Sequence, residues 1–168
     1  MNDIVQLTPQ YIKRKTPSEG LNVQQMAETF IKTGSHPLFL KRQIDPPGAI
    51  YKSDFIGDIF SYVESGIPIV GCMSHKKHGV AIIGHGNLNY TLLDSLDQDY
   101  IYSHELIDTL VISDDNVLPY TDIVKTSDVE SQYTFDNLDY ALVPLYEKMF
   151  LSVGIVKQRV EALLKSRY

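Results

Sequence analysis

The residues best suited to chemistry in this sequence are a histidine and an aspartate at the ends of two short apolar segments. His78 comes directly before the apolar run 79–83, and Asp94 directly follows the run 90–93. If these runs are neighbouring antiparallel strands, the start of one lies beside the end of the next. An imidazole and a carboxylate would then meet at one sheet edge, as a general base and its orienting acid do in nucleophilic catalysis.

Two further aspartates are alternatives for the orienting role. Asp97 and Asp99 follow Asp94 closely. They lie beyond the apolar run rather than at its end, so Asp94 is the first choice.

The only cysteine, Cys72, lies just before the segment that begins with His78. If the two segments form a hairpin around residues 74–77, the thiol could lie near the imidazole, which would lower its pKa and make it reactive. The alternative is that Cys72 is a small buried side chain, as free cysteines commonly are. We adopt this second interpretation.

Three consecutive strands are expected to position these side chains. Each expected strand is a short apolar run between turn residues, which is typical of strands buried on both faces. The three runs are 67–70, 79–83 and 90–93, with Gly66 before the first and Gly71 after it.

From His78 to Gly84 the chain reads HGVAIIG. Together with the following strand that ends in Asp94, this segment resembles the papain-like cysteine peptidases. It is most similar to the bacteriocin-processing-peptidase-like branch, whose histidine strand typically reads G-H-A-V-V-V-V-G, and Lys77 stands where that family usually has glycine. The resemblance covers the middle third of the chain well and the rest in outline. It implies that His78 is the general base and Asp94 its orienter, acting on a peptide or small acyl substrate.

The same resemblance shows what the chain lacks. In that family the nucleophilic cysteine opens a helix well upstream of the histidine strand, and no cysteine precedes Cys72 here. The resemblance therefore implies a papain-like domain truncated at its N-terminus, with the nucleophile outside this chain, which is predicted to be inactive alone. The alternative is a catalytically inactive papain-like binding or structural domain, in which His78 and Asp94 form an ordinary ion pair.

Helical periodicity is present in two segments before the predicted sheet. Apolar residues recur at helical spacing within 23–31 and 55–63, and we expect both stripes to pack on the sheet. Asn22 with Gln25 predicts a capping box for the first helix, and Ser53 is the predicted cap of the second. The prolines of 36–51 predict a loop or short extended pieces.

The later part of the chain predicts further strands. Residues 106–112 are expected to form a strand, or a short helix that begins near Ser103. Residues 113–116 read Ser-Asp-Asp-Asn, which predicts a turn stabilised by its own Asx side chains rather than a calcium loop. Residues 140–145 predict a last strand, which Pro144 would stop or confine to a sheet edge.

The predicted fold class is α+β, a papain-like (cysteine proteinase) fold in one domain over residues 1–168. Its parts are an extended segment at 1–20, a helical part at 21–65, an antiparallel sheet at 66–145 and a C-terminal helix at 150–168. An apolar face on that last helix would suit a missing N-terminal segment or a second copy in a homo-oligomer.

Composition limits the partners. The chain of 168 residues carries a formal net charge of −6, which disfavours a nucleic-acid partner. No apolar run reaches the length of a membrane span, and one cysteine cannot form an internal disulfide, so we expect a cytoplasmic protein without a membrane segment.

The histidines do not predict a metal centre. His78 and His85 lie seven residues apart on an expected strand, or about 23 Å at ~3.3 Å per residue, so they cannot share one ion within a chain. His75 with His78 and Asp94 is a weaker alternative. We assign no metal and no cofactor from the sequence.

Overall fold

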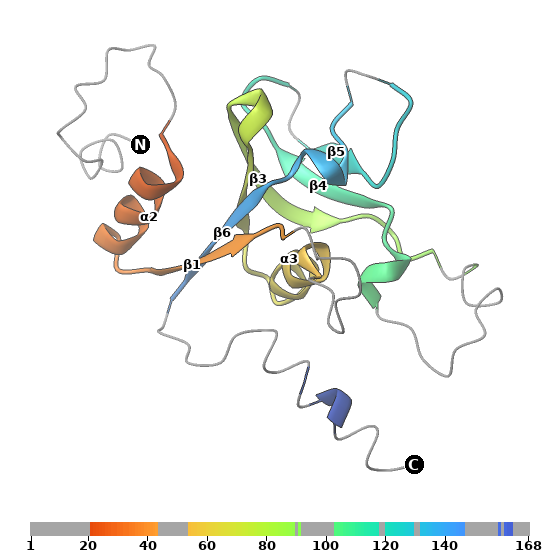
Figure 1. The fold of residues 1–168 in the computed structure, drawn as a ribbon, viewed down its shortest axis with the longest axis horizontal. Coiled ribbons are helices and arrows are strands. Elements are labelled where there is room, and N and C mark those ends of the chain that lie inside the picture. Colours follow the sequence, from red (N-terminus) through yellow and green to blue (C-terminus); the bar gives the residue numbers. More distant parts are fainter. Residues whose placement is uncertain are drawn as a thin grey trace.

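The structure is a computed structural model that describes residues 21–43, 54–89, 91, 103–117, 120–129, 132–146, 158 and 160–162. Two helices and a six-stranded antiparallel sheet make up most of this part of the chain (Figure 1). The predicted α+β class is therefore confirmed. Among the described residues, no helix combines the length and the apolar character that crossing a membrane requires.

The order of strands in the sheet differs from their order in the chain. The sheet runs β1-β6-β2-β3-β4-β5, and every neighbouring pair is antiparallel. The elements are α2 (Val23–Lys32), β1 (His36–Lys41), α3 (Phe55–Glu64), β2 (Ile69–Met73), η1 (Ser74–Lys76), β3 (His78–His85), η3 (Ser103–Leu106), β4 (Thr109–Ser113), β5 (Thr121–Val124), η4 (Phe135–Asn137) and β6 (Tyr140–Leu145).

One of the two predicted helix caps is correct. At α2, the side chain of Asn22 accepts the backbone N–H of Gln25 at 2.9 Å, and the side chain of Gln25 accepts the N–H of Asn22 at 2.9 Å. This is the predicted capping box. At α3 the cap is Asp54 rather than Ser53, because the Asp54 carboxylate accepts the N–H of Gly57 at 2.8 Å.

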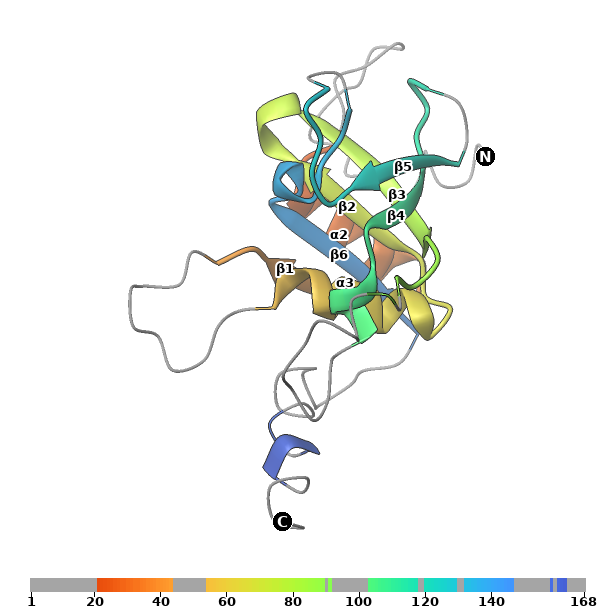
Figure 2. The same cartoon turned by 90° about the vertical axis from the view of Figure 1, so that its right-hand side faces the viewer.

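The two helices bury their apolar stripes to different extents. α3 packs on one face of the sheet and buries Phe55, Ile59, Phe60 and Val63, as predicted (Figures 1 and 2). α2 contacts β1 and β6, and its buried residues are the polar Gln25 and Thr29. The apolar residues Val23, Met26, Ala27 and Phe30 are half-buried and Ile31 is exposed, so the prediction that the stripe packs on the sheet holds only in part for α2.

The proline-rich segment contributes the edge strand β1. Pro37 is compatible with β1 because an edge strand bonds a neighbour on one side only. β1 precedes α3 in the chain, so the predicted helical part 21–65 also contains a strand of the sheet.

The predicted last strand is present as β6, but it lies inside the sheet, between β1 and β2, so of the two effects predicted for Pro144 the edge position is wrong. The pairing explains why the proline is tolerated. On the β2 side the ladder extends only from Tyr140 to Leu142, and on the β1 side Pro144 lies opposite Pro37. The ladder with β2 therefore ends before it reaches Pro144, and no backbone donor is needed there.

The predicted hairpin around residues 74–77 is confirmed. β2 and β3 pair from Ile69 with Ile82 to Met73 with His78, and η1 and Lys77 connect them. Lys77 adopts a left-handed conformation with φ 50° and ψ 40°, which turns the chain into β3.

Several predicted segments fall wholly or largely outside the described residues. Of the predicted strand 90–93, only Thr91 is described. The segment 1–20 is not described, and the predicted C-terminal helix is described only at 158 and 160–162.

The predicted strand 106–112 begins later, since η3 occupies Ser103–Leu106 and β4 starts at Thr109.

A single apolar core joins α3 to the inner face of the sheet. Its members are wholly or nearly buried and come from α3, from β2 to β4, from β5, from β6 and from the segments between them. Its largest fully buried side chains are Ile59, Ile69, Met73, Ile82, Ile107, Leu110, Ile112, Ile123, Leu138 and Val143, and Leu142, outside this cluster, is fully buried as well.

Candidate functional site

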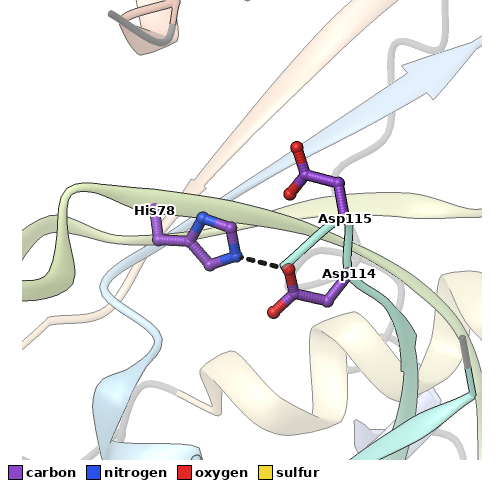
Figure 3. A group of neighbouring side chains, drawn as sticks. All are labelled: His78, Asp114 and Asp115. Atoms are coloured by element: carbon purple, nitrogen blue, oxygen red, sulfur yellow. Dashed lines mark hydrogen bonds and ion pairs between the residues drawn. The ribbon is translucent and has the colours of Figure 1, made fainter. Parts of the chain in front are cut away.

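A histidine and an aspartate meet where β3 begins and β4 ends. His78 is the first residue of β3, and Asp114 directly follows β4. Nε2 of His78 lies 2.8 Å from Oδ1 of Asp114 (Figure 3). Side chains two residues apart on a strand point to the same face of the sheet. His78 therefore lies on the face of Val80, and Asp114 on the face of Ile112. Val80 and Ile112 are both core residues, so the pair lies on the core face of the sheet.

The pair is largely shielded from solvent. The side chain of Asp114 is 0% exposed and that of His78 is 16% exposed. Burial raises the pKa of Asp114, but the backbone N–H of Asn116 and the His78 ring together outweigh burial, and the pKa lies below the ordinary value of an aspartate. Asp114 is therefore charged at neutral pH and accepts a hydrogen bond from the imidazole.

The carboxylate of Asp114 indicates which imidazole nitrogen carries the proton, and the Asn116 side chain is compatible with that assignment. The Asn116 amide nitrogen lies 3.3 Å from Nδ1 of His78 and 3.5 Å from Nε2. An amide N–H can donate only to an unprotonated ring nitrogen, and Asp114 can only accept from Nε2–H. The network therefore assigns the Nε2–H tautomer to neutral His78, with Nδ1 as the basic nitrogen.

Tyr133 flanks the pair. Its ring centroid lies 6.3 Å from that of His78, and the Lys76 ammonium lies 5.3 Å from the Tyr133 centroid on a cation–π contact. The Tyr133 hydroxyl interacts with the Asp114 carboxylate, which contributes to the low pKa of Asp114. Burial, followed by the charge of Asp114, raises the pKa of Tyr133 in turn.

A second carboxylate stands beside the pair. Asp115 is exposed, and one ligand-type atom from each of His78, Asp114 and Asp115 lies within 4.8 Å of the other two (Figure 3). Oδ2 of Asp114 is buried and has no hydrogen-bond partner of normal geometry among the described residues. The Tyr133 hydroxyl interacts with the same carboxylate, but it makes no hydrogen bond of normal geometry to Oδ2.

Cys72 does not belong to this site. It pairs with Gly79 while Met73 pairs with His78, and because successive side chains alternate, the thiol points to the sheet face opposite the imidazole. Burial, with a smaller effect from the charge of Asp139, raises the pKa of the Cys72 thiol to about 11. The interpretation of Cys72 as a buried apolar side chain is confirmed, and a thiolate activated by His78 is not.

Sequence reasoning found His78 but gave Asp114 only a structural role. The predicted Asx turn is present, since Asp114 Oδ1 accepts the N–H of Asn116 at 2.9 Å. The same oxygen also faces His78, which the local pattern of residues 113–116 did not indicate. The predicted orienter, Asp94, and its alternatives Asp97 and Asp99 lie outside the described residues.

The other described histidines lie apart from the site. His75 is exposed on η1 and is not part of the cluster. At the far end of β3, His85 Nε2 lies 2.6 Å from Glu64 Oε1 and Nδ1 lies 2.6 Å from the carbonyl oxygen of Gly86. These contacts join β3 to the end of α3 and give His85 a structural role.

Comparisons with protein-family models, with curated proteins and with solved structures find no match to this chain.

Proposed function

We propose that this chain supplies the base and the orienting acid of a papain-like, thiol-dependent site that hydrolyses an amide or transfers an acyl group. The observation that carries the proposal is the 2.8 Å hydrogen bond between His78 Nε2 and the fully buried carboxylate of Asp114. Asp114 thus takes the role that the sequence suggested for Asp94.

The burial of the acid supports this assignment. A charged carboxylate in a water-poor environment fixes the ring orientation and stabilises the imidazolium that forms when the base accepts a proton. With Nε2 held by Asp114, Nδ1 is the nitrogen left to exchange protons with a reacting group. The amide of Asn116 must move from Nδ1 for this exchange to occur.

The nucleophile would come from outside residues 1–168. Cys72 is the only cysteine of the sequence, and it lies on the sheet face opposite His78. A thiol carried by a further polypeptide segment or by a partner chain would therefore complete the site. The chain alone is expected to lack cysteine peptidase activity.

The reaction follows from the basic nitrogen. Nδ1 of His78 accepts the thiol proton, and the thiolate attacks the carbonyl carbon of a peptide or small acyl substrate. The carbon–sulfur bond forms, the carbon–nitrogen bond breaks, and the imidazolium returns its proton to the departing amine. Water then hydrolyses the thioester and regenerates the thiol, or another nucleophile takes the acyl group.

The test supplies the missing thiol in solution. The chain is mixed with 2-mercaptoethanol and 4-nitrophenyl acetate, and transfer of the acetyl group is followed by release of nitrophenolate. We expect wild type to accelerate thiolysis about tenfold over His78→Gln, which is less than the roughly 10²–10⁴-fold of a general base acting on a positioned group, because the thiol is free in solution. His75→Gln removes an exposed histidine three residues away and is the matched control, which should react like wild type. Equal rates for wild type and His78→Gln would overturn the proposal.

A catalytically inactive binding or structural domain is the second candidate. Two observations favour it: the Asn116 amide lies 3.3 Å from Nδ1, and the only thiol of the sequence faces away from His78. In that case His78→Gln lowers the free energy of unfolding and changes no acyl-transfer rate.

A further inference from the structure

We propose that His78, Asp114 and Asp115 bind one divalent transition-metal ion of the zinc class, and that the bound ion excludes the general-base role of His78. The proposal concerns the same side chains as the proposed function, but it is tested by binding alone, without substrate or thiol. A failure of one therefore leaves the other standing.

The ligand atoms of the three side chains are spaced closely enough for one ion. Zinc bonds of 2.0–2.2 Å in a tetrahedral site place neighbouring ligand atoms about 3.3 Å apart. His78 Nε2 and Asp114 Oδ1 are already 2.8 Å apart, so replacing the shared proton by a metal requires an opening of about 0.5 Å. The Asp115 carboxylate, within 4.8 Å of both, closes the remaining distance by rotating its exposed side chain.

The buried carboxylate of Asp114 lacks a full set of hydrogen-bond donors. The Asp114 side chain is 0% exposed, yet its Oδ2 has no hydrogen-bond partner of normal geometry among the described residues. A buried anionic oxygen without a full set of donors costs free energy, which a cation bound to the same carboxylate offsets. This observation is independent of the spacing of the cluster.

The surrounding groups suit a metal ligand set. A histidine bound to metal through one nitrogen normally donates from the other to an oxygen acceptor. If the metal takes Nε2, the proton resides on Nδ1, and the Asn116 amide lies 3.3 Å from that nitrogen. Rotation of the amide by half a turn then presents its oxygen as the acceptor. The Asn116 backbone N–H continues to orient Asp114 at 2.9 Å.

The donor set indicates the class of ion. Two carboxylates balance the charge of a divalent cation, and water completes a tetrahedral shell beside the exposed Asp115. An imidazole ligand favours zinc and related ions, whereas calcium and magnesium prefer sites built wholly from oxygen. A bound ion occupies Nε2 and places the proton on Nδ1, so His78 can no longer act as the base.

The test is a calorimetric titration of the metal-free chain with zinc chloride, and with calcium and magnesium chloride in parallel. We expect one zinc ion per chain and weaker binding of the other two ions. His78→Gln and Asp115→Asn should each weaken zinc binding about tenfold or more. The matched controls Asp128→Asn and His75→Gln change exposed residues outside the cluster and should bind zinc as wild type does.

Asp115 is exposed, so its variant is expected to fold, and an unchanged thermal midpoint checks this. Absence of saturable zinc binding to wild type overturns the proposal. Wild-type affinity in either His78→Gln or Asp115→Asn also overturns it, as does a preference for calcium or magnesium over zinc.

Discussion

Nε2 of His78 and Oδ1 of Asp114 lie 2.8 Å apart although 36 positions separate the two residues in the chain. The antiparallel pairing of β3 with β4 brings them together. Ala81 opposite Ser113 is the last pair of this ladder. His78 lies three residues before Ala81, and Asp114 directly follows Ser113. The imidazole is held by a strand and the carboxylate by a turn anchored to the next strand, so both groups are positioned by the sheet.

Asp114→Asn should destabilise the protein in a pH-dependent way. The pKa of Asp114 is lowered in the folded state, so its charged form contributes stability above the unfolded pKa of about 3.9. This contribution is lost as the pH falls through the lower folded value. At neutral pH we expect a loss of about 1.5–3 kcal/mol, typical of hydrogen bonds to charged groups.

Urea unfolding of wild type and Asp114→Asn at neutral and acid pH measures the effect. The two proteins should converge in stability under acid conditions. Asp128→Asn, at an exposed aspartate, is the control and should differ little from wild type at either pH. A gap between wild type and Asp114→Asn that stays constant across this range would contradict the role of the charge.

Gly71 is predicted to be intolerant of a side chain. A Cβ added there would lie 2.9 Å from both Ile82 Cδ1 and Leu138 Cδ2, closer than carbon atoms approach without displacement. We expect Gly71→Ala to lower the free energy of unfolding by about 1–3 kcal/mol, as overpacking does. Gly84→Ala is the control on the neighbouring strand, where the nearest atom, Val111 Cβ, lies at 3.7 Å. Equal losses in the two variants, measured by chemical denaturation, would rule out this explanation.

Lys77→Gly should stabilise the turn that precedes His78. Lys77 has φ 50°, a left-handed conformation that costs a residue with a side chain about 1–2 kcal/mol. Glycine removes this cost but adds about 0.4–1 kcal/mol of unfolded-state entropy. The expected net gain is about 0–1.6 kcal/mol in the free energy of unfolding. Lys77→Ala keeps the left-handed strain and should show no gain in stability. If Lys77→Ala gains as much stability as Lys77→Gly, the effect comes from loss of the lysine side chain and not from relief of backbone strain.

Arg42 joins the end of β1 to the segment that follows Tyr133. Its guanidinium donates to the carbonyl oxygens of Leu138 at 2.9 Å and Phe135 at 2.5 Å. Arg42→Lys should lower the free energy of unfolding by about 1.5–3 kcal/mol, because an ammonium group cannot donate to both carbonyl oxygens as the planar guanidinium does. Asp136→Asn, which removes only a pair with an 86% exposed carboxylate, should cost less than about 1 kcal/mol. A larger loss of stability in Asp136→Asn than in Arg42→Lys, measured by thermal or chemical unfolding, would contradict this assignment.

Local patterns were sufficient for the parts of the fold that local interactions determine. The Asn22–Gln25 capping box and the apolar stripe of α3 depend on residues three or four apart, and the sequence shows both directly. The hairpin before His78 was also predictable, because its strands are adjacent in the chain and its turn is short. The α+β class followed from these elements.

Non-local pairing accounts for what the sequence did not reveal. β6 inserts between β1 and β2, and no local signal gives this order, whereas Pro144 on its own suggests an edge. The partner of His78 shows the same limit. Asp94 and Asp114 both lie near the end of a short apolar run, so the sequence alone places either carboxylate at the end of a strand. Only the pairing of β3 with β4 selects Asp114 among the described residues.

The most direct test of the account is a nitrogen NMR spectrum of the His78 imidazole in the metal-free chain. We predict that neutral His78 carries its proton on Nε2, with Nδ1 unprotonated, and that this preference is lost in Asp114→Asn. The control Asp128→Asn should keep the wild-type spectrum. A proton on Nδ1 in wild type, or a tautomer that is unchanged in Asp114→Asn, would contradict the claim that Asp114 orients His78 as a base.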